Sequence, residues 1–172
     1  YRGTASLSDG GAISGATSPT LTIDPVLTTD AAADYNVVIS GSAPCVAVTS
    51  TNAALVANEA VVITTQPVPD QTVCSGTNVS FNVTATGTGL SYQWRRNGVN
   101  LTNGGIVSGA TSPNLTLTGV TSANGGTYTV VVSGASPCPS VTSTNAELIV
   151  NQAVAITTQP APTQTTCSGS SV

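Results

Sequence analysis

The segment Val79-Ser80-Phe81-Asn82-Val83-Thr84 alternates apolar and polar side chains, one residue at a time. Successive side chains of a β-strand point to opposite faces, so this period of two predicts a strand with one buried and one hydroxylated face. Similar short runs follow, separated by Gly, Pro and Asn-Gly turn residues, at 61–65, 90–94, 115–117, 127–132 and 146–150. No segment has the 3.6-residue period of a helix. The sequence therefore predicts an all-β fold of packed antiparallel strands.

The sequence also repeats itself. Ser14–Pro19 recurs as Ser108–Pro113, and a spacing of 93 residues separates Cys45 from Cys138 and Cys74 from Cys167. Such self-similarity predicts a tandem array of modules. Residues 1–58 are interpreted as the second half of one module, 59–151 as a complete module and 152–172 as the start of a further one. Both ends then fall inside a module, so we expect a longer array.

Composition restricts the functions open to the chain. Charged residues make up 6% of the 172 residues, the net charge is −4, and the basic residues are Arg2, Arg95 and Arg96. So few cations cannot neutralise a row of phosphates, which excludes nucleic acid as a partner. Hydrophobic residues amount to 40%, enough for a core. No apolar run reaches the roughly 18 residues of a membrane span, so we expect no membrane insertion.

The residues around the predicted core resemble an immunoglobulin module. The stretch Asn124–Val130 is similar to the end of such a module, where a tyrosine two residues before the second core cysteine forms a "tyrosine corner". The resemblance implies a core signature of six residues, namely Val83, Trp94, Tyr128 and Val130 with Tyr35 and Val37 in the earlier copy. The valines stand where that family has its core disulfide, and their packing can replace the bond.

The sequence of the whole repeat is similar to that of the immunoglobulin-like repeats of large Bacteroidota surface and secreted proteins. The segments that carry this resemblance are Thr72–Gly76, Tyr92–Trp94, Ser108–Thr111 and Tyr128–Gly134 before Cys138. It implies tandem immunoglobulin-like antiparallel β-sandwich modules, with a repeat of about 93 residues, and an extracellular or cell-surface location. It identifies a module type and leaves the function open, because one fold serves many functions.

Two cysteines occur in each repeat, and all four are disulfide candidates. Resemblance implies that Cys74 and Cys138 belong to one module, with Cys45 and Cys167 as their copies. The sandwich topology argues against a bond within the module, because the first inter-strand loop and the last hairpin loop lie at opposite ends. The loops of consecutive modules do meet at their junction. A bond within the module, a bond at a junction or between chains, and free thiols all remain open.

The sequence offers no catalytic residue, cofactor site or metal site. Nucleophilic catalysis needs a base beside the nucleophile, and the chain contains no His and no Lys. The acids Asp9, Asp24 and Asp34 become Asn103, Thr118 and Thr127 in the next copy. Asp24, Asp30 and Asp34 could gather calcium, and Trp94 with Tyr92 could stack on a sugar. Solvated loop acids and a core tryptophan are the simpler interpretations.

These observations predict a structural, non-catalytic extracellular repeat protein that forms a surface appendage or filament. Its expected partners are neighbouring modules or identical chains, because strand edges without lysine can pair with another chain. Two alternatives remain. The array could be an adhesin that binds a surface glycan or protein ligand, or an inert spacer of a secreted multidomain enzyme.

Overall fold

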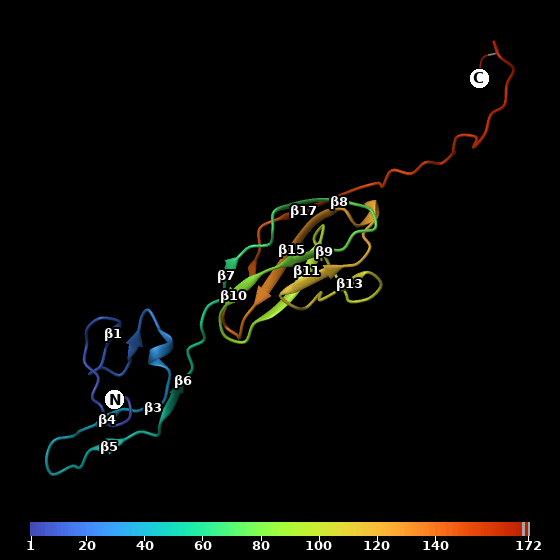
Figure 1. Cartoon of the computed structure of the whole chain (residues 1–172). Coiled ribbons are helices and arrows are strands. Elements are labelled where there is room, and N and C mark those ends of the chain that lie inside the picture. Colours follow the sequence, from blue (N-terminus) through green and yellow to red (C-terminus); the bar gives the residue numbers. More distant parts are fainter. Residues whose placement is uncertain (170, 172) are drawn as a thin grey trace. The chain divides into compact units, whose positions relative to one another are not determined.

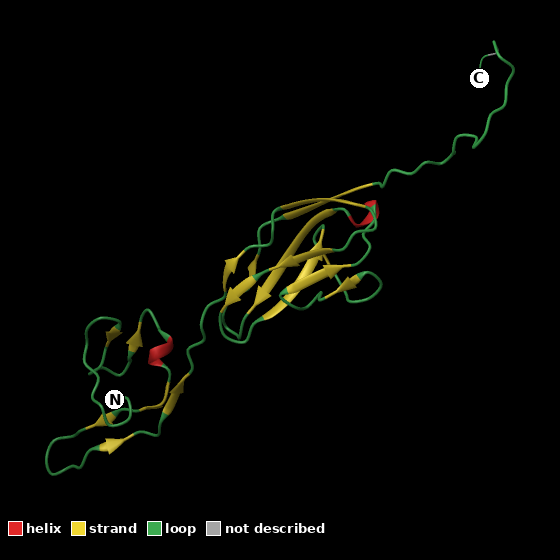
Figure 2. Ribbon diagram, in the orientation of Figure 1, coloured by secondary structure: helices red, strands yellow, loops and turns green. Residues whose placement is uncertain are grey.

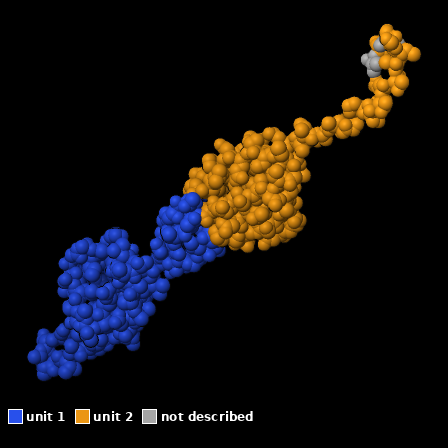
Figure 3. Space-filling model, in the orientation of Figure 1, with its two compact units in different colours: residues 1–65, 84–92, 131–143 blue, residues 66–83, 93–130, 144–172 orange. Residues whose placement is uncertain are grey.

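The computed structural model describes residues 1–169 and 171, and its regular secondary structure is almost all strand, with two short 3-10 turns (Figure 2). The chain divides into two compact units (Figure 3). Unit 1 contains residues 1–65, 84–92 and 131–143, and unit 2 contains residues 66–83, 93–130 and 144–172. We call residues 1–58 the first repeat region and residues 59–151 the second repeat region.

Short antiparallel pairs form the first repeat region. The strands are β1 (Ile13–Ser14), β2 (Thr22–Ile23), β3 (Ala32–Tyr35), β4 (Val38–Ile39), β5 (Val48–Thr49) and β6 (Ala53–Leu55), with a 3-10 turn η1 (Thr28–Asp30). β1 pairs with β2, β3 with β6 and β4 with β5 (Figure 1). No residue of this region is classed as buried. The strands are therefore held mainly by backbone hydrogen bonds.

Longer strands form the second repeat region. They are β7 (Val62–Thr65), β8 (Asp70–Cys74), β9 (Val79–Asn82), β10 (Thr84–Thr86), β11 (Ser91–Arg96), β12 (Val99–Asn100), β13 (Val107–Ser108), β14 (Asn114–Leu117), β15 (Gly126–Ser133), β16 (Val141–Thr142) and β17 (Ala146–Asn151), with a 3-10 turn η2 (Ser122–Asn124). One sheet has the order β12-β11-β15-β17-β8, with β16 also paired to β15. A second has the order β13-β14-β9, and β10 pairs with β7.

Apolar faces of the two larger sheets meet in the core. In the smaller sheet, Phe81 is the register partner of Leu115 and Val79 that of Leu117. The ring of Phe81 lies 6.1 Å from that of Trp94, which belongs to the other sheet. Alternate residues along β9 and β15 are buried, as a period of two requires. These contacts confirm the predicted all-β sandwich.

Two features of the strands differ from the prediction. The expected strand 79–84 is interrupted at Val83. Before the break β9 pairs with β14, and after it β10 pairs with β7 through a register shift. The strand β8 was not predicted, because Asp70–Cys74 has no alternating apolar pattern. Parallel backbone pairing with β17 holds it instead, from Asp70 opposite Glu147 to Cys74 opposite Asn151. Backbone pairing of an exposed edge leaves little trace in the sequence.

The Asn-Gly pair forms the hairpin that its sequence predicts. Arg96 pairs with Val99, and Asn97 and Gly98 between them have φ of 50° and 80°. Both angles lie in the left-handed region, which a two-residue type I′ turn requires. After β17, the described residues 152–169 and 171 contain no strand or helix. Within the described chain, no helix has the length and apolar character that crossing a membrane requires.

Candidate functional site

A buried aromatic cluster occupies the middle of the sandwich. Trp94 on β11 is 0% exposed and Tyr128 on β15 is 1% exposed. The rings of Phe81 and Tyr128 are stacked with centroids 4.9 Å apart. The Trp94 indole N–H donates to the Ser112 carbonyl at 2.9 Å, so its polar atom is satisfied inside the core. A tryptophan enclosed in this way cannot stack on a sugar.

Tyr128 fixes the turn that precedes its own strand. Its hydroxyl donates to the carbonyl oxygen of Asn124, in η2, at 2.7 Å, which is the geometry of a tyrosine corner. Burial raises the pKa of Tyr128, and the neighbouring Arg96 opposes that rise. Arg96 also donates to the Ala123 carbonyl at 2.7 Å. Tyr128 and Arg96 thus both donate hydrogen bonds to carbonyl oxygens of η2.

The two valines of the core signature in the second repeat region are both enclosed. Val83 is 4% exposed and Val130 is 0% exposed. No cysteine lies at either position, so apolar packing fills the place where the family that the sequence resembles has a disulfide. Truncating such a side chain would leave a cavity. The loss of stability would then exceed the transfer free energy of the removed atoms, because the cavity adds its own cost.

In the first repeat region only part of the expected signature forms. The Tyr35 hydroxyl donates to the Asp30 carbonyl at 2.7 Å, as its copy does. Val37, expected in the core, is instead 48% exposed. This corrects the sequence-based expectation for Val37. The physical reason is that the strands of this region form only two-stranded pairs, so no second apolar layer covers the valine.

The repeats share polar turn contacts that sequence reasoning missed. The amide of Ala16 donates to Asp9 Oδ1 at 2.7 Å, and that of Ala110 donates to Asn103 Oδ1 at 2.8 Å. The exchange of Asp for Asn therefore removes a charge and keeps the oxygen acceptor. The same exchange relates Asp30 and Asn124, whose side-chain oxygens accept the amide that opens each 3-10 turn. Comparing acceptor atoms rather than charges would have revealed these pairs.

All four cysteines in the described chain are free thiols. Cys74 lies at the end of β8, opposite Asn151. Cys138 follows β15, whose eight residues run in the opposite direction to β17. Eight strand residues span roughly 25 Å, far beyond the Cα separation of about 7 Å that a disulfide tolerates. Cys74 and Cys138, which the resemblance places in one module, are not bonded to each other in this structure.

Acidic residues do not gather anywhere in the described part of the chain. There, no three residues among Cys, Asp and Glu approach closely enough to hold a metal ion. Glu147 accepts from the Thr127 hydroxyl at 3.1 Å, and Asp30 accepts the Leu27 amide. These acids act as hydrogen-bond acceptors on strands and turns.

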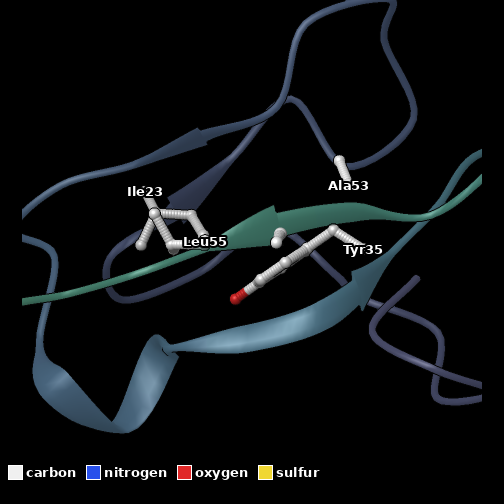
Figure 4. Close-up of a pocket in the computed structure, with 5 residues that line it drawn as sticks. Ile23, Tyr35, Ala53 and Leu55 are labelled. Atoms are coloured by element: carbon white, nitrogen blue, oxygen red, sulfur yellow. The ribbon is translucent and has the colours of Figure 1, made fainter.

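An apolar hollow lies in the first repeat region. It has a volume of about 180 Å³ and is lined by Ile23, Tyr35, Ala53, Ala54 and Leu55 (Figure 4). Their equivalents in the second repeat region include Leu117, Tyr128 and Leu148, each 1% exposed. The residues that line the hollow are therefore equivalent to core residues of the second repeat region. The hollow carries no polar side chain other than the Tyr35 hydroxyl.

The sequence matches a known domain family over much of the second repeat region. Residues 62–134 match the family described as "Immunoglobulin domain". The fold is immunoglobulin-like. This confirms the predicted fold class, and the resemblance is confirmed at the level of immunoglobulin-like repeats. No curated protein matches the sequence.

Solved structures of tandem immunoglobulin domains share this fold. Extracellular domains 3–5 of Drosophila OTK align with a TM-score of 0.67 at 14% identity, covering 83% of this chain and 47% of that one. An I-band fragment of titin aligns with a TM-score of 0.64 at 17% identity, covering 85% and 52%. Tandem Ig repeats of Dlar give 0.50 at 21% identity, covering 77% and 69%. The chain spans about half the length of the first two.

Proposed function

We propose that this chain is a structural, non-catalytic segment of an extracellular repeat protein that assembles into a surface appendage or filament. The observation that carries the proposal is what the two repeat regions have in common. They share apolar positions and turn hydrogen bonds, while the acidic side chains differ from copy to copy. A repeated core without a repeated carboxylate is the pattern expected of a scaffold.

The edges of the larger sheet support self-association as the mode of assembly. β12 and β8 are its two outer strands, and Val99 on β12 is 70% exposed. Natural sheets commonly protect such edges with charge, lysine above all, and the chain contains no lysine. An unprotected edge can receive a strand of another chain through backbone hydrogen bonds. Identical chains are therefore the partners that we propose.

An extracellular setting fits the same set of observations. The OTK domains with this fold are extracellular by description, and the repeat resembles those of Bacteroidota surface and secreted proteins. Exposed strand positions bear hydroxyl groups rather than ionic ones, for example Ser80 and Thr84. The Dlar fragment with this fold is described as tandem Ig repeats. We therefore place the proposed array of modules outside the cell.

Electron microscopy of the purified chain over a concentration series tests this proposal. Filaments or end-to-end oligomers, with a matching rise in mass by light scattering, are the expected result. A variant with Val99→Lys on the edge strand β12 should assemble less, and Val154→Lys, outside the sandwich, is its matched control. Monodisperse monomers at every concentration would reject the filament. Binding to a glycan array by such monomers would instead favour the adhesin alternative.

A further inference from the structure

The residue that precedes the second repeat region is held by the hairpin loop that contains Cys138. The Asn58 side-chain amide donates to the Ser136 carbonyl at 2.9 Å. The Cys138 thiol in turn lies 3.7 Å from the Asn58 carbonyl oxygen. Cys138 is half-buried in this contact. The thiol of one module is thus placed against the last residues of the module before it.

The repeat places a second cysteine beside the equivalent asparagine. Asn151 lies 93 residues after Asn58 and ends β17. It is the register partner of Cys74, and its carbonyl accepts the Ser75 amide at 2.8 Å. Register partners on neighbouring strands are about 5 Å apart. The cysteine at the end of β8 therefore lies beside the residue that leads out of its own module.

Asn58 and Asn151 occupy the same position of the repeat, so the two contacts can be combined. Combining the Asn58 and Asn151 contacts by the 93-residue repeat would bring the Cys74 position of one module and the Cys138 position of the next module to the same asparagine. We propose that these two cysteines form a disulfide that joins consecutive modules. The Cys138 thiol lies 3.7 Å from the asparagine carbonyl oxygen, and Cys74 is the register partner of the equivalent asparagine. The bond requires the Cα atoms of the two cysteines to lie within about 7 Å of each other.

The pairing rule accounts for all four free thiols. A Cys138-type cysteine pairs with the module before its own, and a Cys74-type cysteine pairs with the module after its own. For Cys45, Cys74, Cys138 and Cys167, the partner position lies outside residues 1–172. Every cysteine of an array is used by this rule, and no bond within a module is needed.

Bond formation is an ordinary thiol–disulfide exchange. Two thiols lose two protons and two electrons, and a low-molecular-weight disulfide such as oxidised glutathione is reduced to two thiols. This inference rests on the proposed extracellular setting, where such oxidants persist. The bond would turn a chain of separate sandwiches into a covalently stapled rod. It would also limit bending at each junction, because two points then connect the modules.

An extended chain tests the bond directly. Tyr1 is equivalent to Arg95, so a copy of residues 59–94 placed before Tyr1 completes the first repeat and supplies the missing Cys74-type cysteine. After exposure to oxidised glutathione, free thiols should fall by two. Mass spectrometry of a non-reduced digest should find the added cysteine joined to Cys138. Cys138→Ser should abolish the bond, and the matched Cys45→Ser should leave it intact.

Two outcomes would overturn the inference. One is a bond between the added cysteine and Cys45, which lies within the completed module. The other is retention of all thiols in a chain whose completed repeat is protected from hydrogen exchange. Should the extended chain fail to fold, two directly joined copies of residues 59–151 provide a second test. There the bond must join Cys74 of the first copy to Cys138 of the second.

The same chains separate this inference from the proposed function. An array that forms filaments in the electron microscope but never forms the junction bond keeps the function and rejects the inference. An array that forms the bond but stays monomeric supports the junction and rejects the filament. Bending measured by small-angle scattering should decrease on oxidation in the chain with Cys138 and remain unchanged with Cys138→Ser.

Discussion

Equivalent residues of the two repeat regions differ sharply in burial. Four apolar positions of the second region are 0% exposed, and their equivalents in the first are 38%, 46%, 48% and 67% exposed. The pairs, in that order, are Leu115 and Leu21, Val120 and Val26, Val130 and Val37, and Val132 and Ile39. The side chains are nearly the same in both copies. Burial is therefore decided by what covers them.

Turn geometry, in contrast, agrees between the two regions. The serine turns agree, with Ser18 and Ser112 each donating to a carbonyl two residues ahead at 2.7 Å. The glycines of these turns also agree, with φ of 75° at Gly15 and 77° at Gly109. Turn chemistry needs only neighbouring residues, so it survives where the second layer is missing. The core needs both layers.

The largest effect should come from removing the central tryptophan. Trp94→Ala deletes the largest side chain of the core and should destabilise the second repeat region by about 3–5 kcal/mol. Chemical denaturation followed by circular dichroism measures this, since the chain has no other tryptophan to report by fluorescence. Val99→Ala, at a position 70% exposed, is the control. Equal effects of the two substitutions would mean that the sandwich core is wrongly placed.

The comparison itself is tested by one substitution made in each copy. Leu115→Ala should cost about 2–5 kcal/mol, because a buried leucine leaves a cavity. Leu21→Ala should change stability by no more than about 0.5 kcal/mol, because its side chain is already exposed. Hydrogen exchange resolves the two regions separately.

In the extended chain, the small expected cost of Leu21→Ala should become large. With residues 59–94 copied before Tyr1, Leu21 gains a covering layer and Leu21→Ala should become nearly as costly as Leu115→Ala. A cost that stays small would show that the first region does not complete a sandwich. The interpretation of residues 1–58 as half a module would then fail.

A smaller effect is expected at the tyrosine corner. Tyr128→Phe removes the hydrogen bond to Asn124 and should cost about 1 kcal/mol. Burial raises the folded-state pKa of Tyr128, so the unfolded chain loses this proton first as the pH rises. Stability should therefore be level below about pH 10 and fall above it.

Alkaline denaturation of the wild type and of Tyr128→Phe isolates this contribution. The part of the fall that belongs to Tyr128 should be absent from the variant. Tyr35→Phe, which removes the equivalent bond to Asp30, is the matched substitution in the first region. An alkaline fall that is identical with and without the Tyr128 hydroxyl would contradict the assignment.

The smallest effect should come from exchanging the turn acceptors. Asn103→Asp and Asp9→Asn each keep the side-chain oxygen that accepts the amide of the seventh residue along the chain. We expect changes within about 0.5 kcal/mol for both. Asn103→Ala removes the side-chain oxygen that accepts the half-buried hydrogen bond from the Ala110 amide. It should lower the stability by about 1 kcal/mol. Denaturant midpoints at two salt concentrations would separate a charge effect from the loss of the hydrogen bond.

Much of the second repeat region could be predicted from its sequence. Alternation along Val79–Val83 and the Asn-Gly turn are local signals, and a period of two admits only one inward face. The strand β8 and the break at Val83 could not be predicted, because both depend on which distant strand offers a hydrogen-bonding edge. The turn acceptors Asp9 and Asn103 were missed because their charges differ.

The sequence by itself determined the fold class, the repeat and its turns, because alternation, left-handed glycines and capping side chains act between near neighbours. Only the tertiary structure decided which apolar residues are buried, since that requires a second layer from far along the chain. It also decided the position of each thiol. Cys138 lies against Asn58 and Cys74 against Asn151 because strand direction and register carry them to opposite ends of a sheet.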